Sequence, residues 1–285
     1  MRVKVAVIGG DRRAVLLAGL LLRDGERLQS FALERAELPE EIPRAEHLQA
    51  ALYGADAVIL PLPVEKGGLL NAPYARLPCR TEEVMDALWP GQIVFGGMFS
   101  ERLRQQAVSQ GLLPVDWMRR SGFVIGNAAL TAEGAVGLLL QESERSLCGS
   151  SVLVSGFGRI GRLLAVKLKA LGAAVTVAAR REESRAEAEA LGYTALPFDT
   201  LSGGFDYVVN TVPERVLGEA FLCCLPETAL LLELASAPGG YDRNLAENLG
   251  LRCLAAPGLP GRSAPQSAAE LLQREFRRAM KEERE

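Results

Sequence analysis

One stretch constrains the fold of this chain more than any other. It is SVLVSGFGRIGRLLAVKLKALGAAVTVAARR, residues 151–181. An apolar run leads into Gly156-x-Gly158-x-x-Gly161, apolar residues then recur at helical spacing up to Gly172, and a second apolar run follows. The first glycine permits a tight turn, the second lets the backbone approach a diphosphate, and the third lets the helix lie against the strand. Because the motif sits inside a complete βαβ pattern, it predicts dinucleotide binding rather than a bare glycine turn.

The diphosphate is expected at the start of the helix, where free amides and the helix dipole favour an anion. The residues expected to contact it are Gly156, Phe157, Gly158, Arg159, Ile160 and Gly161.

The second strand of this unit ends in arginine, where a carboxylate would hold the ribose 2′-hydroxyl of NAD. Arg180 lies 24 residues after Gly156, Arg181 follows it, and Ser184 is close behind. A guanidinium binds a phosphate in forked geometry, so we expect NADP to be preferred over NAD by roughly 10- to 100-fold. The alternative is that these arginines are solvated loop charges.

Two later runs are expected to line the nicotinamide half of the site, because ligands bind outside the carboxyl ends of such strands. VVNTVP supplies Asn210, Thr211, Val212 and Pro213. LELASAPGG supplies Ala235 and Ser236, which we expect near the carboxamide. The alternative for each run is an ordinary turn containing proline and glycine.

The rest of the chain repeats the strand–helix alternation, which predicts an α/β protein with parallel sheets. Strands are expected in residues 3–10, 56–64, 92–98 and 112–118, the last interrupted by Pro114. We expect two doubly wound domains: a flavodoxin-like domain, 1–127 plus a C-terminal helix 262–285, and a Rossmann domain, 128–261. A helix over 132–144, capped by Thr131, should follow a seam at residues 122–126.

Composition narrows the class of function. A net charge of -3 without a basic stripe argues against a nucleic-acid partner. The longest apolar stretches are about ten residues, short of the ~20 that a bilayer span needs, and no signal peptide is evident. The five cysteines have no metal-ligand spacing, so we expect no metal and a reducing cytoplasm.

No obvious acid or base accompanies the motif. The one histidine, His47, is expected on the surface at the start of a helix. The candidates for proton transfer are Thr131 and Glu133, with Asn127 nearby, and their alternative is helix capping. Asp11, in VIGGDRR, would repel a phosphate, so the first domain is expected on the substrate side.

Several stretches in the same order along the chain resemble the family of the dipicolinate synthase A chain. They are VAVIGGDRR, VILPLPV, NAALTAEGAV, VLVSGFGRIGRLLA, VTVAARR, VVNTVP, LASAPGGYD and APGLPGRSAPQSAA. The resemblance implies an arrangement like formate and glycerate dehydrogenases and the mother-cell cytoplasm of a sporulating bacterium. It also implies a partner, the flavoprotein-like B chain of dipicolinate synthase. A homo-oligomer is expected on general grounds.

The resemblance also implies a reaction: NADP-dependent dehydration and oxidation of 4-hydroxy-tetrahydrodipicolinate to dipicolinate. Formation of an aromatic ring would supply driving force without a strong base. Substrate contacts are expected from Pro63, Val64, Gly97, Met98, Asn127, Arg262 and Ser263. Two alternatives remain open: reduction of another small carboxylate, and a regulatory role in which the chain binds NADP without turnover.

Overall fold

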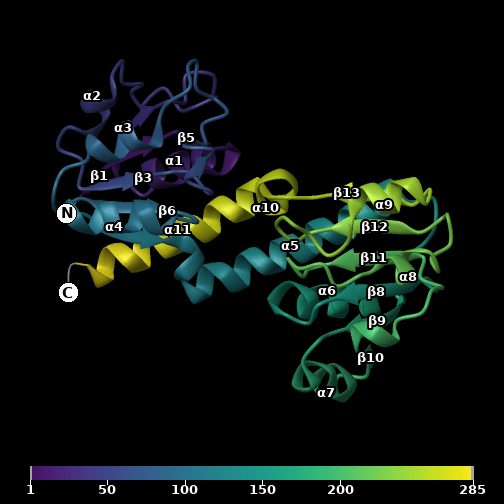
Figure 1. Ribbon diagram of the computed structural model, residues 1–285. Helices are drawn as coiled ribbons and strands as arrows, with labels where there is room; N and C mark the ends of the chain where they lie inside the picture. The colour runs from purple at the N-terminus through teal and green to yellow at the C-terminus, as the bar shows by residue number, and fades with distance from the viewer. Residues whose placement is uncertain (1, 284–285) are drawn as a thin grey trace. The chain divides into compact units, whose positions relative to one another are not determined.

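The computed structural model describes residues 2–283, which form two compact units (Figure 1). The first unit contains the residues up to Asn127 and those from Ala264 onward, and the second runs from Ala128 to Ser263. Both are layered α/β structures built on parallel sheets, which confirms the expected fold class. Residues 262–263 belong to the second unit, two residues beyond the end expected from the sequence.

The first unit has a five-stranded sheet in the order β2-β1-β3-β6-β7, the flavodoxin-like arrangement. Its strands are β1 Lys4–Ile8, β2 Arg27–Phe31, β3 Ala57–Ile59, β6 Ile93–Gly96 and β7 Leu113–Asp116, with a small hairpin of β4 Glu65–Lys66 and β5 Leu69–Leu70. Its helices are α1 Arg12–Arg23, α2 Leu48–Leu52, α3 Thr81–Asp86, α4 Glu101–Ser109, η1 Trp117–Arg119 and α11 Pro265–Glu282.

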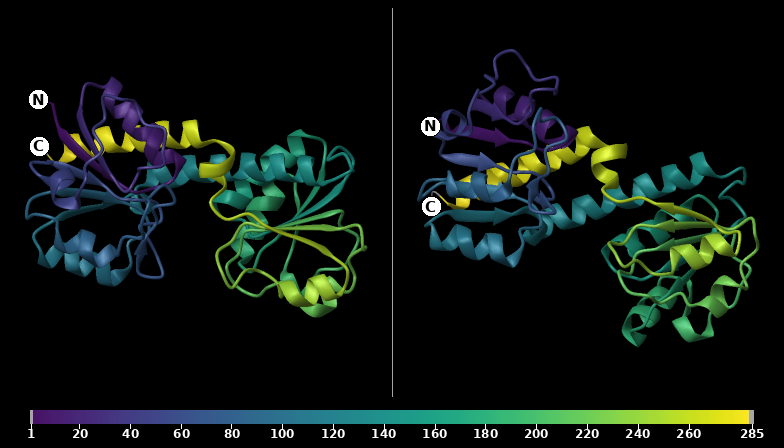
Figure 2. Two further views of the ribbon diagram at one scale, coloured as in Figure 1. Left: turned by 90° about the horizontal axis from the view of Figure 1, so that it is seen from above. Right: turned by 45° about the horizontal axis from the view of Figure 1, so that its top comes forward.

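The C-terminal helix α11 completes the core of the first unit. It packs along α1, as both views in Figure 2 show. Phe276 of α11 lies 4.9 Å, between ring centroids, from Phe95 of β6, which stacks on Trp117. Burial of these aromatic rings joins the two ends of the chain in one hydrophobic core.

Helix α5, Ser121–Glu142, corrects two expectations. It begins ten residues before Thr131, so Thr131 lies inside the helix and does not cap it. The expected seam at residues 122–126 is also helical. A Cβ on Gly126 would come within 2.8 Å of the Leu271 side chain, so this glycine lets α5 and α11 approach closely. Glycine in this stretch therefore marks helix packing rather than a break.

The same helix bears on the expectation about membrane spans. Among the described residues, α5 is long and apolar enough to cross a membrane by length and composition, with a mean hydropathy of 1.6. Buried side chains along it include Phe123, Ala132 and Leu139, which belong to the two hydrophobic cores. A core helix passes the same test, so the finding is weak support for a span.

The second unit has a six-stranded parallel sheet in the Rossmann order β10-β9-β8-β11-β12-β13. Its strands are β8 Ser151–Ser155, β9 Ala174–Ala178, β10 Thr194–Leu196, β11 Tyr207–Asn210, β12 Leu230–Glu233 and β13 Arg252–Ala255. Its helices, besides the end of α5, are α6 Arg159–Ala170, α7 Glu182–Ala190, η2 Phe198–Thr200, α8 Glu219–Leu222, α9 Arg243–Asn248 and α10 Leu259–Ser263.

Short strands at sheet edges escaped the sequence analysis. β2 and β10 are edge strands of 5 and 3 residues; β2 has two buried residues and β10 has none. Because an edge strand has a neighbouring strand on one side only, more of its residues stay exposed and its apolar pattern is weaker. Pro114 is tolerated because β7 is also an edge strand, where a missing N–H can face away from the sheet.

Candidate functional site

The glycine-rich turn joins β8 to α6 at the point where the strand order reverses. Gly156 has φ +96°, and a Cβ there would lie 2.5 Å from Thr211 Oγ1. A Cβ on Gly161 would lie 2.0 Å from the Gly156 carbonyl oxygen. A Cβ on Gly158 would meet nothing within 4 Å. Two of the glycines therefore serve packing, whereas the third borders open space.

That open space lies at an uncapped helix start. Gly158 is the N-cap of α6, no side chain of residues 2–283 forms a capping hydrogen bond there, and the first turn has no acidic residue. Such an N-terminus favours an anion through its free N–H groups and the helix dipole. Phe157 is buried, Arg159 is exposed and Ile160 is half-buried. The turn fits a dinucleotide diphosphate.

Asp11 gives the first unit the opposite arrangement. Its carboxylate accepts a hydrogen bond from the Arg13 amide at 3.0 Å, which caps α1. The same carboxylate binds the Arg13 guanidinium, with Nη2 at 2.7 Å from Oδ2. The N-terminus of α1 thus already holds a carboxylate from its own chain, in line with a turn that binds no phosphate.

Asn210, expected to line the nicotinamide half, is fully buried and its side chain is saturated. Its Oδ1 accepts hydrogen bonds from Ser155 Oγ and the Val212 amide, while its Nδ2 donates to the Val212 carbonyl and to Glu233 Oε1. An amide side chain has no further capacity. Asn210 therefore positions the loop, and the residues after it remain candidates for contact.

The neighbouring hydroxyl is used in a similar way. Thr211 Oγ1 donates to the Ser155 carbonyl at 2.8 Å and lies next to Gly156. Val212 is half-buried and Pro213 is exposed at the rim. The segment thus shapes the wall beside the glycine turn.

Glu233 is a residue of the pocket wall that the sequence analysis missed. Its Oε1 accepts a hydrogen bond from the Ala235 amide at 2.8 Å, and its Oε2 accepts one from the Gly240 amide at 2.8 Å. One carboxylate therefore holds both ends of the loop after β12. The available signal was an acidic residue at the end of an apolar strand, in LLLELAS.

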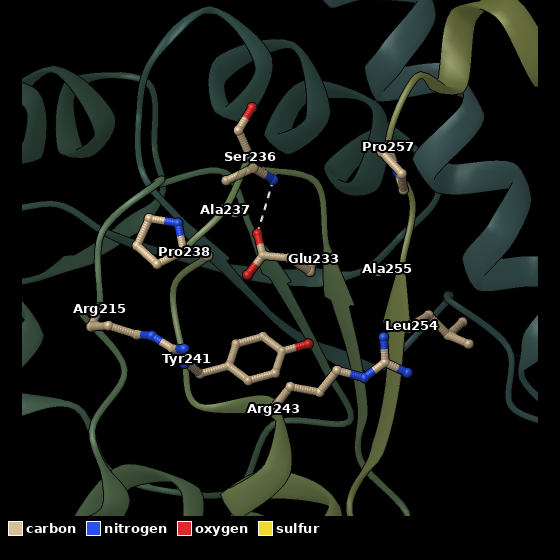
Figure 3. A pocket seen from close by; sticks show the side chains of 12 residues that line it. Arg215, Glu233, Ser236, Ala237, Pro238, Tyr241, Arg243, Leu254, Ala255 and Pro257 are labelled. Carbon is tan, nitrogen blue, oxygen red and sulfur yellow. Dashed lines mark hydrogen bonds between the residues drawn. The ribbon is translucent and has the colours of Figure 1, made fainter. Parts of the chain in front are cut away.

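A pocket of about 280 Å³ opens beside this loop, at the carboxyl ends of β12 and β13 (Figure 3). Ala235 and Ser236 line it, as do Arg215, Tyr241 and Arg243. Burial raises the pKa of Tyr241 above its usual range, with smaller contributions from Cys253 and Glu233. The phenol stays neutral and can donate a hydrogen bond. Arg215 is exposed at the rim of the pocket.

The residues expected at the ribose lie after β9. Arg180 is exposed, and its Nη1 lies 3.0 Å from Glu214 Oε2. Arg181 is the N-cap residue of α7 and is exposed. Ser184 is only 5% exposed, so its side chain packs inside the unit. Arg185 donates from Nη1 to the carbonyls of Ala179 and Arg180 and so steadies the end of the strand.

The substrate-side candidates of the first unit differ in exposure. Val64 is fully buried in the hydrophobic core, so its side chain is not available to a ligand. Pro63 is half-buried, and Gly97 is buried against Leu62. Met98 is 55% exposed and has φ +60°, a left-handed conformation that is uncommon outside glycine. Asn127, on α5, is half-buried.

The proton-transfer candidates do not face one ligand together. Thr131 is 7% exposed, whereas Glu133 is exposed and pairs with Lys167 at 3.6 Å. Positions two apart on a helix differ by about 200° in direction.

The remaining candidates lie elsewhere. Ser263 Oγ donates to the Leu259 carbonyl, and Arg262 is exposed on α10. His47 is exposed at the start of α2.

Two family models match the chain. Residues 4–118 match the N-terminal domain of the dipicolinate synthase A chain, and residues 128–247 match the NAD binding domain of D-isomer specific 2-hydroxyacid dehydrogenases. The second match agrees with a nicotinamide dinucleotide cofactor and an oxidoreductase class.

Individual proteins extend this similarity over nearly the full length. The dipicolinate synthase A chain of Bacillus subtilis is 30% identical over 94% of this chain and 93% of its own. The crystal structure of the corresponding Bacillus halodurans protein superposes with a TM-score of 0.86 at 27% identity, covering 97% of each chain. The crystal structure of the Bacillus subtilis protein also gives 0.86 at 27% identity, covering 100% of this chain and 97% of that one.

Proposed function

The chain belongs to the family of the dipicolinate synthase A chain, and from that premise we propose that it uses NADP to make dipicolinate from 4-hydroxy-tetrahydrodipicolinate. The balanced reaction is loss of one water and transfer of one hydride to NADP⁺, which yields dipicolinate, NADPH and a proton. The observation that carries the proposal is the open, uncapped start of α6 at Gly158, next to an arginine at the end of β9.

In this proposal each part of the second unit has a separate task. The amides at the start of α6 bind the diphosphate, and Arg180 with Arg181 binds the 2′-phosphate. Pro213, Ala235 and Ser236 border the nicotinamide. The bound cofactor would supply the hydride acceptor. Asn210 and Glu233 hold the loops in place and need not touch the ligand.

The substrate carries two carboxylates and therefore needs cationic or N–H donors. Of the residues proposed for substrate contact, Met98, Arg262 and Ser263 are exposed, and Arg262 is the cation among them. Thr131 stays a candidate for proton transfer, while Glu133 is engaged by Lys167. Aromatisation of the ring supplies the driving force, so the reaction needs no histidine in this role.

The proposal extends to the cellular setting. The name of the family implies a partner, and we propose that it is the flavoprotein-like B chain of dipicolinate synthase. We also propose the mother-cell cytoplasm of a sporulating bacterium and a homo-oligomeric state.

A turnover assay tests the function. Purified protein is mixed with NADP⁺ and freshly made 4-hydroxy-tetrahydrodipicolinate, with and without the partner protein, and absorbance is followed for NADPH and dipicolinate. Formation of both in equal amounts supports the proposal. Turnover only with other small carboxylic acids would indicate a different reductase. Binding of NADP without turnover, even with the partner present, would identify a regulatory protein.

A further inference from the structure

The ion pair of Arg180 and Glu214 joins two strand ends that are not neighbours. Arg180 stands two residues beyond the end of β9, and Glu214 stands four residues beyond the end of β11. β8 lies between these strands in the sheet. Since neighbouring strands are about 4.8 Å apart, the two strand ends are about 10 Å apart. The side chains close this distance to 3.0 Å between Nη1 and Oε2.

The register places this pair beyond the end of the strand that carries the glycine turn. Ala178, Ser155 and Asn210 are level across β9, β8 and β11. The turn at Gly156 follows Ser155 directly, so the two side chains meet past that turn. This is the place where the adenosine ribose lies in a Rossmann domain.

Both partners stand on anchored backbone. Arg185 donates hydrogen bonds to the Arg180 carbonyl at 2.7 Å and to the Ala179 carbonyl at 2.9 Å. On the other side, the amides of Val216 and Leu217 both donate to the Gly240 carbonyl at 2.9 Å. The backbone is therefore held at Arg180 itself and again two residues after Glu214, while the charged side chains remain exposed, at 74% for Arg180 and 57% for Glu214.

We propose that Glu214 is a specificity-determining residue that acts through Arg180 and lowers the preference for NADP over NAD. The proposal rests on dinucleotide binding in the second unit as proposed above. The 2′-phosphate must replace Glu214 as the partner of the guanidinium. After that exchange the carboxylate remains nearby and repels the phosphate, whereas NAD brings no second charge to the ribose.

The exposure of the pair makes this exchange feasible. Exposed ion pairs contribute little and are screened by salt, so a forked phosphate displaces the carboxylate readily. The Glu214 carboxylate also provides an acceptor for the 2′-hydroxyl of NAD. In NAD enzymes that acceptor is an Asp or Glu at the end of the second Rossmann strand, which corresponds to β9 here. The site therefore offers a contact to each cofactor.

The experiment measures dissociation constants by calorimetry on the full chain at low salt. The probes are NADP⁺, NAD⁺ and the fragments 2′,5′-ADP and 5′-AMP, which report on the adenosine half alone. The variants are Glu214→Gln, Arg180→Ala and the double variant. Glu142→Gln is the matched control, because Glu142 also pairs with an exposed arginine, Arg252, but at the start of β13. It removes the same charge beside the start of an edge strand, whereas Arg180 and Glu214 follow the carboxyl ends of interior strands.

We expect Glu214→Gln to tighten NADP⁺ and 2′,5′-ADP by about 3- to 10-fold, to leave NAD⁺ unchanged or weaker, and to have a smaller effect when Arg180 is absent, where only the direct repulsion of the phosphate is relieved. Glu142→Gln should change none of the four constants. The inference fails if Arg180→Ala weakens NADP⁺ while Glu214→Gln leaves the NADP⁺ to NAD⁺ ratio unchanged. If neither variant alters 2′,5′-ADP binding, the assignment of Arg180 in the proposed function fails instead.

Discussion

Nδ2 of Asn210 donates a hydrogen bond to Oε1 of Glu233 across 2.7 Å, which joins the carboxyl ends of β11 and β12. The two residues are register partners on neighbouring strands. Glu233 also holds the loop of residues 235–240, and Asn210 also holds the loop that begins at Thr211. One polar contact thus couples the two loops that border the candidate nicotinamide site.

Glu233→Gln should lower the free energy of unfolding by about 1–3 kcal/mol. The carboxylate accepts three hydrogen bonds, and a glutamine would set an NH₂ group against at least one donor. Urea unfolding measures the loss. Glu227→Gln, at an exposed position of the same unit, is the control and should change stability little. Equal stability of wild type and the Glu233 variant would show that these three hydrogen bonds do not hold the loop.

Gly158→Ala and Gly161→Ala should separate binding from folding. The methyl group at 158 meets no atom within 4 Å, so stability should fall by less than about 1 kcal/mol while dinucleotide binding weakens at least tenfold. At 161 the methyl group would lie 2.0 Å from a carbonyl oxygen, which should cost about 3 kcal/mol or more. Thermal melts and NADP⁺ titrations of both variants make the comparison. Unaltered affinity in Gly158→Ala would argue against a diphosphate at this turn.

Arg180→Asp should weaken NADP⁺ binding far more than NAD⁺ binding, by roughly 10- to 100-fold in the ratio. The substitution replaces a donor to the 2′-phosphate with a charge that repels it. Arg145→Asp, at an exposed ion pair of the same unit, changes the net charge equally and is the control. The measurement is a pair of fluorescence titrations. Parallel losses for both cofactors would mean that Arg180 does not contact the ribose phosphate.

Tyr241 should make the folded state sensitive to alkaline pH. Burial raises its pKa in the folded protein, whereas the unfolded chain ionises near 10. Below that pH both states are neutral. Above it the unfolded state releases a proton that the folded state retains, so stability falls as pH rises. Wild type should therefore lose stability relative to Tyr241→Phe between about pH 9 and 11. Denaturant midpoints measure this, and identical pH profiles would contradict it.

The fold around Gly156 could be predicted from the sequence. The motif, its flanking apolar runs and the arginine after the second strand are local patterns, so they predicted the Rossmann unit and its nicotinamide cofactor. The family resemblance, based on ordered motifs over the whole chain, is confirmed as well. The expected start of α5 was wrong, because Gly122 and Gly126 signal a turn locally but serve to pack the helix against α11.

The strand–helix order, the glycine turn and the family could therefore be recognised from the amino-acid sequence. These depend on residues close together in the chain, whose periodicity and steric needs can be recognised directly. Four findings came from the folded structure: Asn210 has no free hydrogen-bonding capacity, Glu233 holds the loop after β12, Val64 and Ser184 are buried, and Glu214 reaches Arg180. Those facts depend on strand order and register, which place residues distant in sequence within a few ångströms of each other.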